Sequence, residues 1–225
     1  LAVDTSSLAC SVALSIDGTV TERHAEEARE HTRLLVPMIR ELLHEASLSS
    51  EELDAIVLGN GPGSFIGMRI AASVAQGLAY GSETPIAPVS SLAAVAAEVL
   101  DTTDAAEVVV AQDAHMNEVY LGAFRRDQDG LPVAVFDECL HTQTPIEELD
   151  ETGADQRVAA GFGWQRYPGL LAANEDRIGN TSDVLYPRAR FLLPLGQAVL
   201  KAGGAVVPQD IAPAYLRSKV AEKPA

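Results

Sequence analysis

The spacing of apolar residues predicts an α/β fold in the first hundred residues. Five segments have the apolar or alternating pattern of strands: residues 1–3, 8–16, 19–24, 54–58 and 85–89. Three segments have helical spacing: residues 30–46, 65–80 and 91–100. Asp17-Gly18, a strong hairpin signal, separates the second strand from the third.

A similar pattern restarts after residue 106. Strand-like segments cover residues 107–111, 118–126 and 132–140, with Asp129-Gly130 as the hairpin turn. Asp4 precedes its Asp-Gly turn by 13 residues, and Asp113 precedes its own by 16. The repeat predicts a duplicated fold of two β-β-β-α lobes, residues 1–104 and 105–225, with the C-terminal tail packing back on the first. Chance repetition of common hairpin turns is the alternative.

Composition and charge narrow the classes of function. The 225 residues are 47% hydrophobic and 21% charged, which is typical of a globular protein. The 16 basic and 32 acidic residues give a net charge of −16, so the chain lacks the basic surface of a nucleic-acid-binding protein. Cys10 and Cys139 belong to no metal or disulfide pattern, and we expect reduced thiols in the cytoplasm. We expect no membrane span or signal peptide, and a short segment preceding Leu1.

The most unusual stretch is glycine-rich and follows a predicted strand. Residues 59–69 read Gly-Asn-Gly-Pro-Gly-Ser-Phe-Ile-Gly-Met-Arg and open a predicted helix, the place where free backbone N–H groups bind anions. The stretch lacks the lysine of a phosphate-binding loop and does not fit the dinucleotide or nucleophile-elbow patterns. A tight strand-to-helix turn is the alternative reading. Asp4, Thr5 and Ser6 could likewise hold a metal–nucleotide complex or form a local turn.

The helices at 30–46 and 65–80 have more apolar surface than one lobe needs. In the first, the apolar arc covers ~180–200°, whereas a surface helix needs about 100°. In the second, Arg69, Ser73, Gln76 and Tyr80 form one polar stripe. This excess predicts either a partner on these helices or full burial within the fold.

Five segments of the chain carry distinctive motifs: residues 1–6, 30–37, 61–69, 111–120 and 214–217. Together they resemble the bacterial TsaB family, also called YeaZ. The resemblance keeps the family's motif order over nearly the whole chain. It implies the duplicated actin/Hsp70/sugar-kinase-like (ASKHA) fold. It also implies a non-catalytic subunit that works with TsaD and TsaE in transferring threonylcarbamoyl to the adenosine beside the tRNA anticodon.

The resemblance further implies that the two long helices bind TsaD, or a second copy of the chain when TsaD is absent. tRNA would then be reached only through the complex. On these helices we expect the partner interface at Leu34, Leu35, Met38, Leu42, Gly67, Ala71, Val74, Ala75 and Leu78.

Departures from related enzymes predict that the chain has no catalytic residues, metal or cofactor of its own. The catalytic relative holds its metal with two histidines, and here Ser91 and Val95 stand at those positions. ATP or ADP is expected at the partner interface or in the partner. Weaker candidates for residues near a nucleotide are Asp4, Thr5, Ser6, Gly61, Gly63 and Asp113. His115 replaces an arginine common in the family, which leaves the role of that position open.

The rival hypothesis is an enzyme: an ATP-dependent phosphotransferase of the actin-like fold or a glycoprotease-like peptidase. Either would need a ligand set for a metal or a phosphate-binding loop, and the sequence marks neither.

We predict that the isolated chain has negligible affinity for tRNA. A net charge of −16, with three lysines, repels a polyanion at ordinary salt. Fluorescence anisotropy with labelled tRNA at physiological salt measures this affinity. Submicromolar binding by the chain alone would contradict the prediction.

Overall fold

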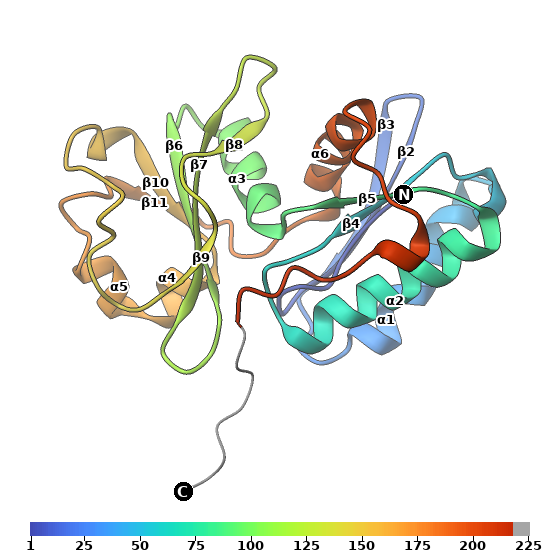
Figure 1. Cartoon of the computed structure of the whole chain (residues 1–225), viewed down its shortest axis with the longest axis horizontal. Helices are drawn as coiled ribbons and strands as arrows, with labels where there is room; N and C mark the ends of the chain where they lie inside the picture. Colours follow the sequence, from blue (N-terminus) through green and yellow to red (C-terminus); the bar gives the residue numbers. More distant parts are fainter. Residues whose placement is uncertain (218–225) are drawn as a thin grey trace, which may run out of the picture.

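The first sheet is formed by the N-terminal strands, in the order β3-β2-β1-β4-β5. Its strands are β1 (Ala2–Asp4), β2 (Cys10–Ile16), β3 (Thr19–Ala25), β4 (Ile56–Gly59) and β5 (Ile86–Val89). β1, β2 and β3 pair antiparallel, whereas β4 and β5 run parallel to β1. The computed structural model describes residues 1–217 of the chain, and Figure 1 shows this sheet in one of two lobes.

The second sheet repeats this arrangement. Its strands are β6 (Glu107–Asp113), β7 (Val119–Arg126), β8 (Pro132–Ala134), β9 (Cys139–His141), β10 (Arg157–Ala160) and β11 (Asn180–Thr181). The order β11-β10-β6-β7-β8 matches the first sheet strand for strand, with β6 and β7 antiparallel and β10 parallel to β6. The shared order confirms the predicted duplication and rules out chance repetition of hairpins.

Two long helices cover the outer face of the first sheet. They are α1 (His31–Glu45) and α2 (Phe65–Ser82), close to the predicted ranges 30–46 and 65–80. Side chains such as Leu35, Ile39 and Ala75 pack there against Val3 and Leu58. The 3₁₀ turn η1 (Ser50–Glu52) connects α1 to β4.

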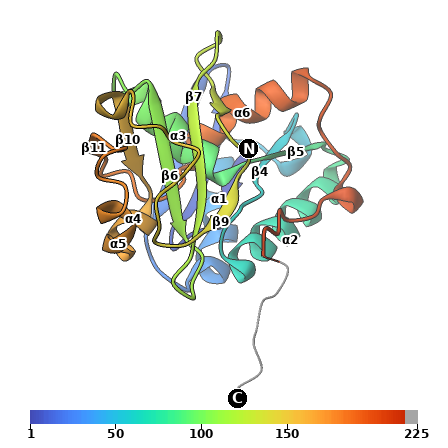
Figure 2. The same cartoon turned by 60° about the vertical axis from the view of Figure 1, so that its left-hand side comes forward.

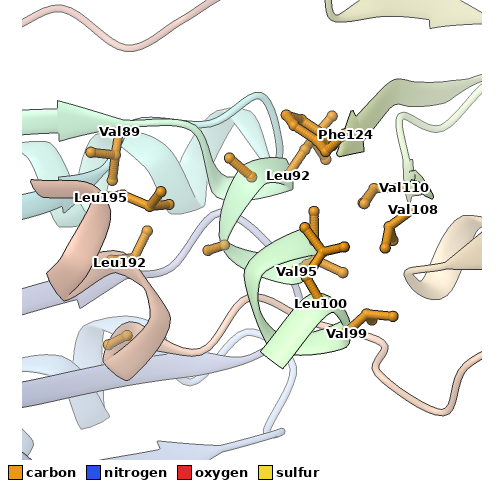
Figure 3. Close-up of a cluster of buried hydrophobic side chains, with 14 of the residues drawn as sticks. Val89, Leu92, Val95, Val99, Leu100, Val108, Val110, Phe124, Leu192 and Leu195 are labelled. Atoms are coloured by element: carbon orange, nitrogen blue, oxygen red, sulfur yellow. The ribbon is translucent and has the colours of Figure 1, made fainter. Parts of the chain in front are cut away.

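The third helix lies between the two sheets. α3 (Ser91–Thr102) buries nine of its twelve residues, more than a helix with a solvent face would bury. Its side chains join one core with Val57 and Ala87 of the first sheet and Val108 and Phe124 of the second. Figure 3 shows Val95 and Leu92 inside this shared core.

The opposite face of the second sheet is covered by short helices. α4 (Phe162–Arg166) and α5 (Pro168–Ala172) pack against it, with Trp164 and Leu170 buried. The 3₁₀ turn η2 (Ala154–Gln156) precedes β10.

The chain then returns to the first lobe. α6 (Ala189–Lys201) packs on the first sheet beside α3, and η3 (Pro208–Asp210) lies against α2. Figure 1 shows the connection between β11 and α6 crossing from the second lobe to the first, and Figure 2 shows α6 and the segment after it from another side. The division at residue 104 stays a prediction, and residues 218–225 of the predicted second domain lie outside the described residues.

Two details of the predicted repeat are wrong. The second lobe has no long helix after its third strand; residues 142–156, with Pro145 and Gly153, form turns and η2 instead. The predicted strand 132–140 is divided into β8 and β9, which both pair with β7.

The close packing of α6 on the first sheet predicts opposite effects of two glycine substitutions. A Cβ atom at Gly196 would lie 2.2 Å from Val57 Cγ2, whereas one at Gly77 in α2 would have nothing within 4 Å. We expect Gly196→Ala to lower the free energy of unfolding by about 1–3 kcal/mol through overpacking. The matched control Gly77→Ala should raise it by about 0.5–1 kcal/mol through helix propensity. Urea unfolding curves measure both, and equal effects of the two substitutions would contradict this packing.

Candidate functional site

The glycine-rich stretch packs against the turn that follows β1. A Cβ atom at Gly59 would lie 1.9 Å from Asp4 Oδ2, and one at Gly67 would lie 1.9 Å from the Thr5 carbonyl oxygen. Side chains at either position would therefore collide with the chain itself. Ser64 caps α2 by accepting a hydrogen bond from the Gly67 N–H, at 3.2 Å. The glycines allow two parts of the chain to approach closely, and Gly61 has the positive φ, 90°, that the turn interpretation of this stretch predicts.

The Asp4 carboxylate is fully enclosed by internal hydrogen-bond donors. The backbone N–H and hydroxyl of Ser6 both donate to Oδ1 at 2.8 Å, and the Ser91 hydroxyl donates to Oδ2 at 2.6 Å. Burial raises the pKa of Asp4 to about 6, although these hydrogen bonds favour the charged form and oppose the shift. The carboxylate therefore has donors from its own chain at both oxygens.

Thr5 and Gly61 belong to the same cluster. The Thr5 hydroxyl donates to the Gly67 carbonyl oxygen at 2.6 Å, and the Gly61 N–H donates to the Ser91 hydroxyl at 3.1 Å. Gly63 is buried against the Ser6 carbonyl oxygen. The structure therefore brings together five of the six residues predicted near a nucleotide: Asp4, Thr5, Ser6, Gly61 and Gly63.

The sixth residue, Asp113, lies on the second sheet at the position equivalent to Asp4. Its Oδ1 accepts hydrogen bonds from the Tyr167 hydroxyl at 2.7 Å and from the His115 N–H at 2.8 Å. Burial, together with this hydrogen bond, raises the pKa of Tyr167 to about 12. The His115 side chain is exposed, with Nδ1 3.2 Å from Asp113 Oδ2.

One carboxyl group that sequence reasoning missed connects the lobes. Glu138, which precedes β9, accepts a hydrogen bond from the Ser90 hydroxyl at the start of α3. Burial raises the pKa of Glu138. Nothing in the local sequence around Glu138 signals this contact, because its partner lies 48 residues away.

An apolar groove of about 390 Å³ runs between α1 and α2. Its walls include Val36 and Ile66, whose side chains are 43% and 70% exposed, and its floor is Leu35. Arg69 also lines the groove, with its guanidinium 3.5 Å from the centre of the Phe65 ring. Exposed apolar side chains around a groove are typical of an association surface.

The family profile described as "TsaD: tRNA N6-adenosine threonylcarbamoyltransferase" matches residues 19–161. The Escherichia coli "tRNA threonylcarbamoyladenosine biosynthesis protein TsaB" is 36% identical over 99% of this chain and 96% of its own length. The chain belongs to the TsaB family.

Two solved structures of Pseudomonas aeruginosa proteins share the fold of this TsaB-family chain. One is described as an uncharacterized protein with similarity to peptidase YEAZ; it is 36% identical, with a TM-score of 0.88, over 96% of this chain and 98% of its own. The other, described as YeaZ, is 33% identical, with a TM-score of 0.83, over 95% and 98%. The predicted actin-like (ASKHA) fold is thereby confirmed.

Several TsaB-family interface residues predicted here lie inside the lobe. The structure buries Leu35, Leu42, Gly67, Ala71 and Ala75. These five therefore pack inside the first lobe, although Leu35 also lines the groove between α1 and α2. Helical spacing gives the width of the apolar arc and not which part of it faces the sheet, and a partner contact at these residues stays a prediction. Leu34, Met38, Val74 and Leu78 are half-buried and stay predictions. The most exposed apolar residues of α2, Ile66 and Tyr80, were not among the predicted interface residues.

Ser91 and Val95, the two positions that the resemblance matched with metal ligands, both make contacts within the protein. The Ser91 hydroxyl bonds to Asp4, and Val95 lies in the shared core. Among residues 1–217, no cluster of three or more His, Cys, Asp or Glu side chains is arranged to hold a metal ion. Over the same residues, no helix is long and apolar enough to cross a membrane.

The buried Asp4 predicts a specific pH dependence of stability. Its pKa of about 6 in the folded protein lies above the ordinary aspartate value of 3.8. Between these two pH values the folded state therefore binds a proton that the unfolded chain has released. This contribution to stability is therefore lost as the pH rises from about 4 to 6, by about 3 kcal/mol.

The variant Asp4→Asn should lack that loss, because its amide cannot ionise and still reaches the Ser91 hydroxyl. The difference in free energy of unfolding between the two proteins, measured by urea unfolding from pH 4 to 7, isolates Asp4 from other carboxylates. Parallel curves for the two proteins would contradict the assignment.

Proposed function

We propose that this chain is a non-catalytic subunit that supports threonylcarbamoyladenosine formation in tRNA by binding a TsaD-type enzyme on the α1–α2 surface. The apolar groove between the helices is the observation that carries the proposal. Val36, Ile66, Ile70 and Val74 line it, and burial of such side chains against a partner is the main source of association energy. The role in threonylcarbamoyladenosine formation is supported by the relatives, which are named as proteins of tRNA threonylcarbamoyladenosine biosynthesis.

A supporting rather than catalytic role fits the chemistry around Asp4. To bind a metal–nucleotide complex at this place, the chain would need carboxylate oxygens and backbone N–H groups that are free to face it. Here both oxygens of Asp4 accept internal hydrogen bonds, and Gly59 and Gly67 lie against the chain. The rival phosphotransferase and peptidase functions would need free groups of this kind. We therefore place ATP or ADP at the partner interface or in the partner.

The remaining components follow from charge and from the family. TsaE is the third protein of the proposed complex, and the same groove pairs two copies of this chain when TsaD is absent. The net charge of −16 favours tRNA binding through the complex and not through the chain alone. We place the complex in the cytoplasm, where tRNA is modified.

The substitution Ile66→Asp tests the surface. Ile66 is 70% exposed, so the change should leave the melting temperature nearly unaltered. Burying a carboxylate against an apolar partner should weaken TsaD binding by about 2 kcal/mol or more, at least a thirtyfold rise in Kd. Calorimetric titration with TsaD from the same genome measures the Kd.

Val133→Asp is the matched control, because Val133 is also exposed, at 42%, but lies on β8 of the second lobe. Transfer of threonylcarbamoyl to tRNA by the chain with TsaD and TsaE should fall with Ile66→Asp and persist with Val133→Asp. Undiminished TsaD binding by folded Ile66→Asp would remove the groove from the interface. Product formation by the chain alone would instead support an enzyme.

A further inference from the structure

The segment after α6 is fixed along the first lobe by a series of hydrogen bonds. They join Val206 to Ile86, Pro208 to Gln76, and both Ala212 and Ala214 to Asn60. Distances are 2.8–3.0 Å throughout. Figure 2 shows the segment running along α2. Its course up to residue 214 therefore belongs to the first lobe.

Tyr215 connects this segment to the wall of the α1–α2 groove. Its ring lies 5.6 Å from the Phe65 ring, centre to centre, and its hydroxyl accepts a hydrogen bond from Arg69 Nε at 2.9 Å. Arg69 also lines the groove. A change in the position of Arg69 would therefore also move Tyr215.

Two residues further on, Arg217 binds the second lobe. Its Nη2 atom lies 2.5 Å from Glu118 Oε2 and donates to the Ala114 carbonyl oxygen at 2.9 Å. The Arg217 side chain is only 16% exposed, so the pair is better shielded from water than an ordinary surface ion pair. The last described residue of the chain is thus held by the opposite lobe.

The contacts of Arg217 lie on a strained turn between β6 and β7. His115, Met116 and Asn117 all have φ between 54° and 62°, a left-handed region that side-chain-bearing residues rarely occupy in succession. Two backbone hydrogen bonds close the turn, from the Ala114 N–H to the Glu118 carbonyl and from the Glu118 N–H to the His115 carbonyl. Arg217 therefore contacts a residue at each end of this turn, Ala114 and Glu118.

We propose that residues 214–217 form a strap that couples the α1–α2 groove of the first lobe to the β6–β7 turn of the second. A change in the position of Arg69 at the groove moves Tyr215. The movement of Tyr215 in turn alters the contacts of Arg217 with Glu118 and Ala114. Occupation of the groove then changes how often the turn opens, and loss of either end of the strap breaks the coupling. The identity of the groove's occupant, a TsaD-type protein, rests on the function proposed above. The coupling between the two lobes within the chain does not depend on it.

The first experiment uses the chain alone and residue-resolved amide exchange by NMR. Arg217→Gln should speed exchange of the Ala114 and Glu118 amides about threefold or more, because the ion pair no longer holds the turn. Tyr215→Ala should also speed them, although Tyr215 touches neither amide. If both substitutions act through one strap, these two amides should exchange no faster in the double variant than in Arg217→Gln.

Arg33→Gln is the matched control, because Arg33 also forms ion pairs, with Glu27 and Glu30, but on the exposed side of α1. It should leave exchange in the turn unchanged. Unaltered Glu118 exchange in Tyr215→Ala, or additive effects in the double variant, would overturn the strap. Thermal melting followed by circular dichroism distinguishes local opening of the turn, which leaves the melting temperature unchanged, from loss of the whole fold, which lowers it.

The second experiment adds TsaD at saturating concentration. Exchange of the Glu118 amide should change on binding in the unmodified chain, and that change should vanish in Arg217→Gln while TsaD still binds. Binding with the same change in Arg217→Gln would overturn the coupling. Absence of binding by the unmodified chain would count against the proposed function, and the first experiment would still decide the strap.

Discussion

The burial of α3 between two sheets is the constraint on which the rest of the structure depends. Its alanine- and valine-rich surface packs on both sides, so that the two lobes share one core instead of meeting through a polar cleft. Such sharing means that neither sheet could keep its inner face covered if the other moved far away. The hydrogen bond from Ser90 to Glu138 and the ion pairs of Arg188 with Glu22 and Glu98 add polar contacts around this core.

The same constraint explains why the Asp4 carboxylate, in the turn after β1, is hydrogen-bonded within the chain. Ser91 is the first residue of α3, and its hydroxyl both donates to Asp4 and accepts from the Gly61 N–H. Holding α3 against both sheets therefore holds Ser91 over the carboxylate. The Ser91 side chain is therefore part of the packing between loop, strand and helix.

Local patterns were enough to predict most of the first lobe. Helical spacing located α1 and α2 to within about two residues, and the two Asp-Gly turns revealed the duplication. The segment after β8 could not be predicted in this way, because the second lobe keeps the strand order of the first but replaces its long helix with turns.

The surface was harder to predict than the fold for a physical reason. Leu35 and Val36 are neighbours with similar hydrophobicity, yet one is 1% and the other 43% exposed. Only the position of the sheet distinguishes them. The contacts of Arg217 with Glu118 and of Glu138 with Ser90 join residues 99 and 48 positions apart, and no local pattern records such distances.

The small side chains of α3 have a consequence for how an assembly could be adjusted. Ala93, Ala94, Ala96 and Ala97 are buried, so methyl groups help to set the separation of the two sheets. A larger residue at one of these positions could be accommodated only by a shift of one sheet relative to the other, at a cost in stability, and such a shift would reorient the surfaces that each sheet supports. Evolution could in this way alter the angle between distant binding surfaces while leaving every residue on those surfaces unchanged.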